Sequence, residues 1–433
     1  MIESEQGDPS ENTVAGASKG YANYVLAILF LVYVFNFVDR QIVSIFIGPI
    51  RAEFGLSDTQ VGLLVGFAFA LLYTFAGIPI ARLADRKSRR TIIAIGLAFW
   101  SAMTVATGMA RSTMALFAAR VGVGLGEAAG TPPAHSLIVD YFSEGQRARA
   151  LAIYSSAVFF GSGLAYIGGG YMREHFDWRT AFYVLGIPGV LFAFIVFFTV
   201  REPARVTTSR SDLAEQPSFM TTLTYLVQCK SWRYLLLGSS SIAVVGYGLL
   251  MWVYEFYARL HGLSPVEIGL WMALSTAAGG AIGTVAGGWI TDYLYVRSPS
   301  RSIVVPGLLT LSAMPFGAAA LMAGSVETSM GFLFVFTVLL NMYMATMYNA
   351  NQCLARPNMR ATATAIVLFS LNLVGAGLGP LIIGGLSDFF SAGYGDESIR
   401  YALLSALAFG VLGSSLYVLS GRHFEGDLRR IQQ

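Results

Sequence analysis

The first hydrophobic stretch of the chain is YVLAILFLVYVFNFVDRQIVSIF (Tyr24–Phe46), and it carries Asp39 and Arg40 side by side near its end. A helix needs about 20 apolar residues to cross a bilayer, and this stretch provides them. A charge at membrane depth costs roughly 2.5–3.5 kcal/mol on insertion scales, so it is retained where it faces a partner or a water-filled cavity. The stretch therefore predicts a membrane-spanning helix that contributes to a polar site.

A second apolar stretch, RVGVGLGEAAGTPPAHSLIVDYF (Arg120–Phe142), also carries both signs of charge, in Arg120 and Glu127. Seven helical positions bring these two side chains to within about 20° of one face and roughly 10 Å apart along the axis. They are too far apart for a direct bridge but share a stripe suited to a cavity wall. Thr131-Pro132-Pro133 should interrupt the helix, because proline removes a backbone donor.

The composition indicates a membrane protein. The 433 residues are 55% hydrophobic and only 12% charged, with a mean hydropathy of +0.61, whereas soluble chains have about 25% charged residues. A net charge of +3 argues against nucleic acid as a partner. Cys229 and Cys353 have neither zinc spacing nor a disulfide pattern. We find no nucleotide loop or catalytic triad either, so the sequence predicts no enzyme, cofactor or metal site.

Apolar runs divide the chain into twelve predicted spans. Most of the 28 Lys and Arg residues fall on the side that carries the N-terminus, so the positive-inside rule places both termini in the cytoplasm and the protein in the cytoplasmic membrane. Residues 1–20 lack the apolar core of a signal peptide. The predicted spans are 21–47, 59–81, 91–110, 114–139, 148–172, 179–200, 232–258, 266–291, 302–323, 329–353, 361–387 and 399–420.

The spans form two similar sets of six. ARLADRKSRR (Ala81–Arg90) follows the second span, and GWITDYLYVR (Gly288–Arg297) follows the eighth, each with an aspartate at the end of a glycine-rich helix. Such repeats are typical of transporters in which two bundles rock around a central site. We therefore predict an all-α membrane fold of two pseudo-symmetric six-helix bundles. The boundaries are a tail 1–20, a bundle 21–200, a linker 201–231, a bundle 232–420 and a tail 421–433.

The segment Ala81–Arg90 resembles the loop signature of the major facilitator superfamily, Gly-x-x-x-Asp-Arg-x-Gly-Arg-Arg. It matches at Asp85, Arg86, Arg89 and Arg90 and departs at its two glycine positions. The elements FNFVDR (35–40) and VGLGEA (123–128) resemble the Spinster-type transporters of that superfamily more closely. The resemblance covers nearly the whole chain. It implies alternating access and a sphingolipid-like or lysophospholipid-like cargo, moved in exchange with or driven by protons.

The resemblance also implies a cytoplasmic gate. Asp85 would cap the start of the eleventh span near 360–362, and Asp292 the start of the fifth span near 147–149, in the outward-open state. The gate set is Asp85, Arg86, Asp292, Arg147 and Arg149.

For the central site we expect Glu127 and Asp39 to exchange protons, while Arg40, Arg120 and Asn36 balance charge or hold the cargo. The alternative for Glu127 is a buried structural salt bridge to Arg40 or Arg120, and for Asp39 an ion pair that orients its helix. In the second half, polar and aromatic residues suit either a cavity wall or ordinary packing. These residues are Tyr247, Trp252, Tyr254, Asn341, Tyr348, Asn349 and Asn372.

The sequence thus predicts a monomeric, proton-coupled secondary transporter of a lipid-like amphiphile, embedded among membrane lipids. Three other functions stay open: a proton-coupled organic-anion symporter, a multidrug proton antiporter, and a receptor or scaffold that transports nothing.

Overall fold

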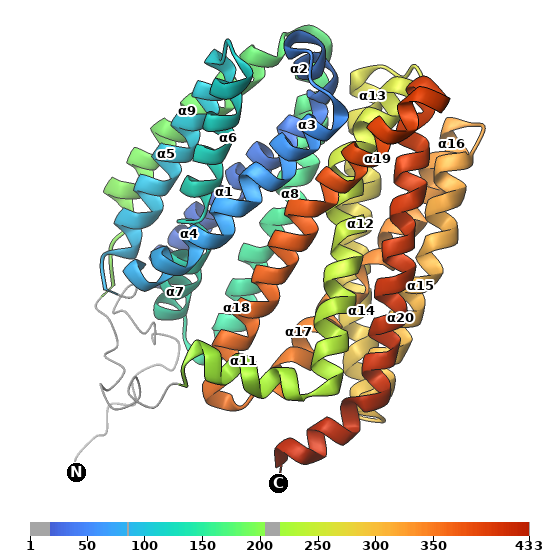
Figure 1. The fold of residues 1–433 in the computed structure, drawn as a ribbon. Coiled ribbons are helices and arrows are strands. Elements are labelled where there is room, and N and C mark those ends of the chain that lie inside the picture. Colours follow the sequence, from blue (N-terminus) through green and yellow to red (C-terminus); the bar gives the residue numbers. More distant parts are fainter. Residues whose placement is uncertain (1–17, 85, 204–216, 433) are drawn as a thin grey trace.

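The computed structural model describes residues 18–84, 86–203 and 217–432, which form α-helices, short π- and 3-10 segments and turns, without a β-strand among them (Figure 1). Ten continuous helical segments of this part are long and apolar enough to cross a membrane. One of the ten, Pro357–Ile431, contains the last two spans, and the fourth span is divided between two shorter helices. The predicted number of twelve spans is therefore confirmed.

We call the helices before residue 201 the first half and those after residue 217 the second half. Each predicted span corresponds to one helix or to a run of consecutive helical segments. The first half contains α1 (Lys19–Ile45), α2 (Ile47–Phe54), α3 (Asp58–Gly62), η1 (Leu63–Phe67), α4 (Ala68–Ala84), α5 (Arg89–Met109), α6 (Thr113–Glu127), α7 (Thr131–Tyr141), α8 (Glu144–His175) and α9 (Trp178–Thr199).

The second half begins with a short helix that lies across the bundle, α11 (Phe219–Gln228), within the predicted linker (Figure 1). The spans follow as α12 (Lys230–Leu260), α13 (Pro265–Met272), η2 (Ala273–Ala278), α14 (Gly279–Tyr295), α15 (Pro299–Met322), α16 (Val326–Asn341) and α17 (Tyr343–Leu354). The chain ends with η3 (Pro357–Met359), α18 (Arg360–Ser370), η4 (Leu371–Leu378), α19 (Gly379–Tyr394), η5 (Gly395–Glu397) and α20 (Ser398–Gln432).

The described ends of the chain, in α1 and α20, lie at one end of the bundle, which is the bottom of Figure 1. We call this the terminal end and the opposite one the far end. α20 continues to Gln432, so residues 421–432 of the predicted tail prolong the helix of the last span. The extension is held because Phe424 is buried and because the Asp427 carboxylate accepts hydrogen bonds from the amide and hydroxyl of Ser231, at 2.8 and 2.6 Å.

The expected interruption of the fourth span is present. α6 ends at Glu127 and α7 begins at Thr131, with Pro132 and Pro133 in the first turn of α7, where a missing backbone donor is tolerated. Glu127 is therefore the last residue of a helix inside the bundle, with its side chain next to a bend.

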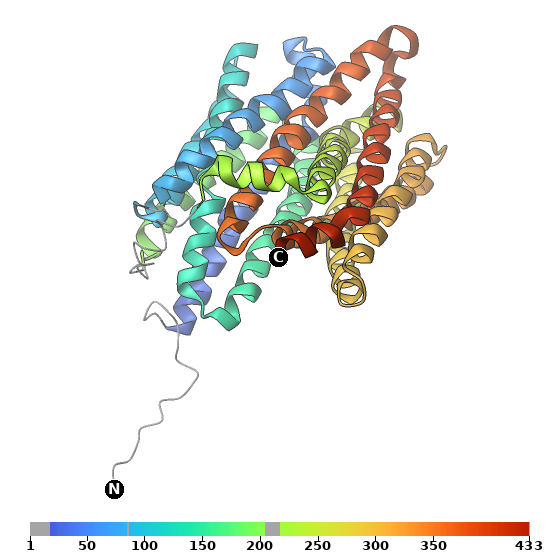
Figure 2. The ribbon, with the colours of Figure 1, turned by 60° about the horizontal axis from the view of Figure 1, so that its bottom comes forward.

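Glycines bring the two halves into close contact from the far end towards the middle of the bundle. A Cβ at Gly66 of η1 would lie 2.7 Å from the carbonyl oxygen of Gly377 in η4, and one at Gly170 of α8 would lie 2.5 Å from that of Pro265. A side chain at Gly384 would collide with the backbone of α3 at its first residue. Only glycine permits backbones to approach this closely. Figure 2 shows the terminal end brought forward, with α11 crossing in front of the bundle.

Large apolar side chains cover the outward faces of several spans, as expected of a surface in contact with lipid. Phe198 is 76% exposed and Trp289 74% exposed, and they belong to opposite halves of the chain. A soluble protein rarely exposes apolar surface on this scale.

A surface ion pair at the far end gives a pH-dependent contribution to stability. The Glu53 carboxylate accepts two hydrogen bonds from Arg179, both at 2.6 Å, and these bonds lower the pKa of Glu53 below its ordinary value. A lowered folded-state pKa contributes stability above the unfolded-state pKa and loses it as the pH falls through the folded-state value. We expect the melting temperature of the wild type to fall more steeply than that of Arg179→Gln between about pH 5 and pH 3. Thermal unfolding in detergent at a series of pH values measures this, and parallel curves would contradict it.

Candidate functional site

The four charged residues predicted inside the membrane meet between α1 and α6, and they pair crosswise. The Nε atom of Arg40 lies 2.6 Å from Oε2 of Glu127, and Nη1 of Arg120 lies 3.4 Å from Oδ1 of Asp39. Asp39 and Arg40 are neighbours on α1 and point about 100° apart, whereas Arg120 and Glu127 are about 10 Å apart along α6. Each residue of α1 therefore reaches a different residue of α6. Glu127 makes the bridge to Arg40 that the sequence left as an alternative.

The pairs are buried to different degrees. The side chains of Asp39, Arg120 and Glu127 are at most 6% exposed, whereas that of Arg40, at 14%, keeps more access to its surroundings. Two buried ions repay their loss of hydration only when they are well paired, and removing one partner leaves the other uncompensated. Arg40 and Glu127 are therefore strongly dependent on one another.

Asp39 has a second partner that the sequence analysis missed. The hydroxyl of Thr104 in α5 donates a hydrogen bond to Oδ2 of Asp39, and it also contacts the carbonyl oxygen of Trp100 at 3.0 Å. Thr104 is fully buried. Asp39 is thus fixed by an arginine and a hydroxyl together, whereas Arg40 is the one hydrogen-bond partner of the Glu127 side chain among the described residues. The only feature of the sequence that indicated this role for Thr104 was the position of a threonine within an apolar span.

Aromatic rings surround the Arg40 guanidinium. Its central carbon lies 5.2 Å from the ring centre of Phe37, 5.0 Å from that of Phe69 and 4.5 Å from that of Tyr73. Cations within about 6 Å of an aromatic face are attracted to it. These rings provide Arg40 with a second environment in which it can remain if Glu127 loses its charge.

Several buried polar atoms of the site have no hydrogen-bond partner within the described residues. They are Oε1 of Glu127, Nε of Arg120 and Oδ1 of Asn36. Asn36 lies one helical turn before Arg40 and is 4% exposed. Buried polar atoms are usually satisfied, so unused donors and acceptors beside a cavity indicate a place where protons, water or a polar substrate group can bind.

A cavity between the two halves is lined by the two arginines of this site, Arg40 and Arg120. The volume open to the centres of water molecules is about 30 Å³, so the cavity holds about two waters in this conformation. The charged and polar part of its wall comes from the first half, and the second half contributes mainly apolar side chains. The lining residues are Phe37, Arg40, Gln41, Val65, Phe69, Arg120, Tyr247, Leu250, Met251 and Ala376.

Of the seven second-half residues proposed for the cavity, Tyr247 belongs to this lining. Trp252 and Tyr254 are fully buried between helices, where Nε1 of Trp252 donates to the carbonyl oxygen of Pro380 and the Tyr254 hydroxyl donates to that of Pro265, both at 2.9 Å. Asn341 donates to the Thr337 carbonyl oxygen at 2.8 Å, within its own helix. Tyr348, Asn349 and Asn372 are partly buried and lie outside the lining described above.

The proposed gate residues are not brought together among the described residues. Asp85 lies outside the described part of the chain. Asp292, Arg86 and Arg149 are exposed, and the Nε atom of Arg147 donates to the carbonyl oxygens of Val139 and Phe142, each at 3.0 Å. In this conformation the close contacts between the halves lie towards the far end, so the gate at the terminal end stays a prediction for another state.

The loop signature holds the end of the first half through Arg89. Its guanidinium contacts Asp140 at 2.5 Å and Glu202 at 2.8 Å. Glu202 also accepts from the amide of Arg90 at 2.9 Å and caps α5. These contacts fasten the start of the linker to the first half. The sequence alone does not indicate Asp140 or Glu202 as partners of Arg89.

Comparisons with known proteins agree with this geometry. A sequence profile of the Major Facilitator Superfamily matches residues 29–380. An "MFS-type efflux pump" of Mycolicibacterium smegmatis is 31% identical, over 93% of this chain and 93% of that protein. Protein spinster homolog 1 of Mus musculus is 28% identical, over 97% of this chain and 84% of its own length.

A solved structure is similar throughout. It is the crystal structure of a bacterial homolog to the human lysosomal transporter Spinster in an inward-facing, unoccupied conformation, with a TM-score of 0.88 and 31% identity. The match covers 95% of this chain and 99% of that one. Together with the twelve spans and the charged site between α1 and α6, these matches show that the chain belongs to the Major Facilitator Superfamily and is of the Spinster type.

Proposed function

We propose that this chain is a proton-coupled secondary transporter of a lipid-like amphiphile, such as a sphingolipid or lysophospholipid, that works by alternating access. The observation that carries the proposal is the Arg40–Glu127 pair, in which Arg40 lines the cavity between the halves and Oε1 of Glu127 has no hydrogen-bond partner among the described residues. A carboxylate in this position can take up a proton from the cavity, and its charge decides what Arg40 binds.

The coupling follows from the exchange of partners at Arg40. When Glu127 is ionised, it holds the guanidinium at 2.6 Å. When Glu127 is protonated, the attraction weakens, and Arg40 is held by the rings of Phe69 and Tyr73 and can turn to an anionic group of the cargo. Asp39 is held by both Arg120 and Thr104, so we assign it the smaller share of proton exchange and a larger part in orienting Arg120.

An amphiphile fits the asymmetry of the cavity wall. Arg40, Gln41 and Arg120 provide a polar side, and Leu250 and Met251 of α12 provide an apolar one. Because the cavity is small in this conformation, cargo requires the halves to move apart. The close contacts towards the far end are those expected of a state open at the terminal end, as in the inward-facing crystal structure named above.

We further propose that the terminal end faces the cytoplasm, since the positive charges gather there in the sequence, and that the protein acts as a monomer in the cytoplasmic membrane. The similarity to an efflux pump favours a second candidate, a proton antiporter of drug-like compounds.

Transport by the purified protein in proteoliposomes tests the function. We expect substrate-dependent proton movement with lysophospholipids or sphingoid lipids, monitored by a pH-sensitive dye inside the vesicles. Small organic anions and lipophilic drugs are measured alongside in the same preparation, with protein-free vesicles as the control. Proton movement with the anions or drugs alone would reassign the protein to the corresponding transporter class. Its absence with all three classes would contradict proton-coupled transport.

A further inference from the structure

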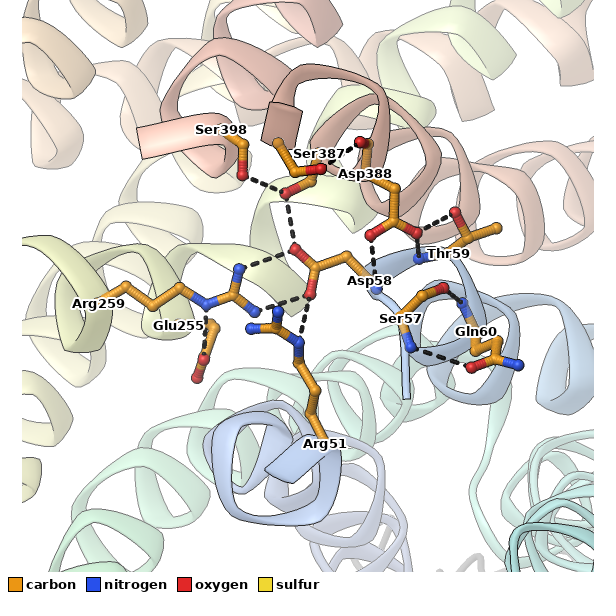
Figure 3. A network of polar contacts seen from close by, with 11 residues as sticks. Arg51, Ser57, Asp58, Thr59, Gln60, Glu255, Arg259, Ser387, Asp388 and Ser398 are labelled. Atoms are coloured by element: carbon orange, nitrogen blue, oxygen red, sulfur yellow. Dashed lines mark hydrogen bonds and ion pairs between the residues drawn. The ribbon is translucent and has the colours of Figure 1, made fainter. Parts of the chain in front are cut away.

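A second network of ions joins the two halves at the far end, and its centre is the carboxylate of Asp58 at the start of α3 (Figure 3). Arg259 of α12 approaches it with both terminal nitrogens, each at 2.8 Å, and the hydroxyl of Ser387 in α19 donates to it at 2.7 Å. Arg51 of α2 also contacts it, through Nε at 3.2 Å. Asp58 is 2% exposed, so this carboxylate is buried among partners from both halves.

The neighbouring acid of α19 reaches back to the first half. Asp388 accepts hydrogen bonds from the amides of Asp58 at 3.0 Å and Thr59 at 2.8 Å, and from the Thr59 hydroxyl at 2.5 Å. The amides at a helix N-terminus have no partner within the helix, and a carboxylate satisfies them. α3 and α19 therefore hold one another through two carboxylates, since Asp58 accepts from Ser387 of α19 and Asp388 accepts from the first residues of α3 (Figure 3).

The network continues along α12. Nε of Arg259 contacts Glu255 at 2.8 Å, as residues four positions apart on one helix can. Glu255 also lies 3.8 Å from Arg173 of α8 in the first half. Arg173 donates to the carbonyl oxygen of Ile45 at 2.5 Å, again within the first half.

Asp58, Arg259, Glu255 and Arg173 share one pattern, in which each ion has a partner across the interface and another within its own half. Asp58 has Arg259 across the interface and Arg51 beside it. Arg259 has Asp58 across the interface and Glu255 on its own helix. When the halves separate at this end, only the cross-half contacts are lost. A buried ion without any partner is strongly unfavourable, and the own-half partners prevent that outcome.

We propose that these residues form a partner-exchange latch, in which the cross-half pairs hold the far end closed while Arg51 and Glu255 keep Asp58 and Arg259 paired when it opens. The consequence is that Arg51 and Arg259 act in opposite directions, although both bind the same carboxylate. Arg259 stabilises the closed far end, and Arg51 stabilises the open one. The proposal depends on neither the cargo nor the proton coupling, so it can fail or hold independently of the proposed function.

The structure indicates the size of each effect. The side chain of Arg51 is 40% exposed, and without it the closed state still provides Asp58 with Arg259 and Ser387. Arg51→Gln should therefore lower the ratio of open to closed molecules roughly two- to fivefold, the range for a partly exposed pair. Arg259→Gln removes two charge-assisted hydrogen bonds from the closed state alone, so it should raise the ratio roughly tenfold or more.

Distances between spin labels at the far end measure this ratio. Arg111 and Glu327 are exposed residues of opposite halves near this end and suit cysteine labelling, once the two native cysteines, Cys229 and Cys353, are replaced by serine. A Ser387→Ala background removes one cross-half hydrogen bond and keeps all the ion pairs, which raises the open population to a measurable level. Thr59→Ala removes a different cross-half hydrogen bond and serves as a second background if the first variant does not fold.

Two further variants complete the test. Arg179→Gln removes an ion pair of 2.6 Å at the same end, but one that joins only first-half residues, and should leave the ratio unchanged. Arg51→Lys keeps the charge and should restore most of the open population that Arg51→Gln loses. A rise in the open population with Arg51→Gln, or no change, would overturn the partner-exchange latch, and the same conclusion would follow if Arg259→Gln did not open the far end.

Discussion

Replacing Glu127 by glutamine is expected to abolish proton-driven accumulation of substrate while leaving the protein folded. Glutamine keeps the shape of the side chain and part of its hydrogen bonding, but it cannot ionise. Arg40 would then permanently face a neutral group, as it does in one half of the proposed cycle. Binding of the cargo can persist in this variant, because an arginine released from its carboxylate remains available to an anionic group.

The measurement compares internal acidification of proteoliposomes upon substrate addition for the wild type and Glu127→Gln. Glu144→Gln is a suitable control, because that carboxylate is 93% exposed at the terminal end. Asp39→Asn should act in the same direction but less completely, since Arg120 and Thr104 already occupy its oxygens. A Glu127→Gln variant that moves protons with its substrate at the wild-type rate would transfer the coupling role to Asp39 or remove it altogether.

The sequence was sufficient to predict the fold because its signals were strong and local. Long apolar runs gave the twelve spans, and the two consecutive prolines after Thr131 gave the break in the fourth. Charges inside apolar runs identified Asp39, Arg40, Arg120 and Glu127 as members of a site without reference to any partner. Each of these inferences follows from the free-energy cost of placing a charge, or a backbone group without a hydrogen bond, in hydrocarbon.

The pairing within the site could not be predicted, because it depends on how α1 and α6 are rotated against one another. Spacing along α6 argued against a bridge between Arg120 and Glu127, but it did not determine which residue of α1 each of them binds. Thr104 was missed for the same reason, since a threonine in an apolar span is equally compatible with a bond to its own helix. The partner of Trp252 could not be predicted either, because its Nε1 atom donates to the carbonyl oxygen of Pro380, 128 residues away in the chain.

The far-end network was missed because its central residue resembles an ordinary helix start. Asp58 directly precedes the predicted second span, where an acidic residue commonly stabilises a helix N-terminus. Its partners Arg259 and Ser387 lie 201 and 329 residues away in the chain. The pair of Glu255 and Arg259, by contrast, follows from spacing alone, because the two residues are only four positions apart on one helix.

The largest effect on stability is expected from Arg40→Gln, and most of it should be reversed by adding Glu127→Gln. The carboxylate of Glu127 is fully buried, and Oε1 has no hydrogen-bond partner among the described residues. Removing Arg40 therefore leaves a buried charge without its counter-ion, which costs about 3–5 kcal/mol of the free energy of unfolding. The double variant has two neutral amides in contact and should recover most of that loss. The contact between the Arg40 guanidinium and the ring of Tyr73 is absent from both variants, so this part of the loss is not recovered.

Unfolding by a graded increase of denaturing detergent in mixed micelles measures the four members of this double-mutant cycle. The cycle isolates the coupling between the two side chains, because effects that each substitution has on other neighbours cancel. We expect a coupling of about 2 kcal/mol or more, near the upper part of the range for residues in contact. A double variant no more stable than Arg40→Gln would show that Arg40 acts through its aromatic neighbours rather than through Glu127. In that case a change in the charge of Glu127 could not control Arg40, and the proposed exchange of partners at the centre of the transport cycle would fail with it.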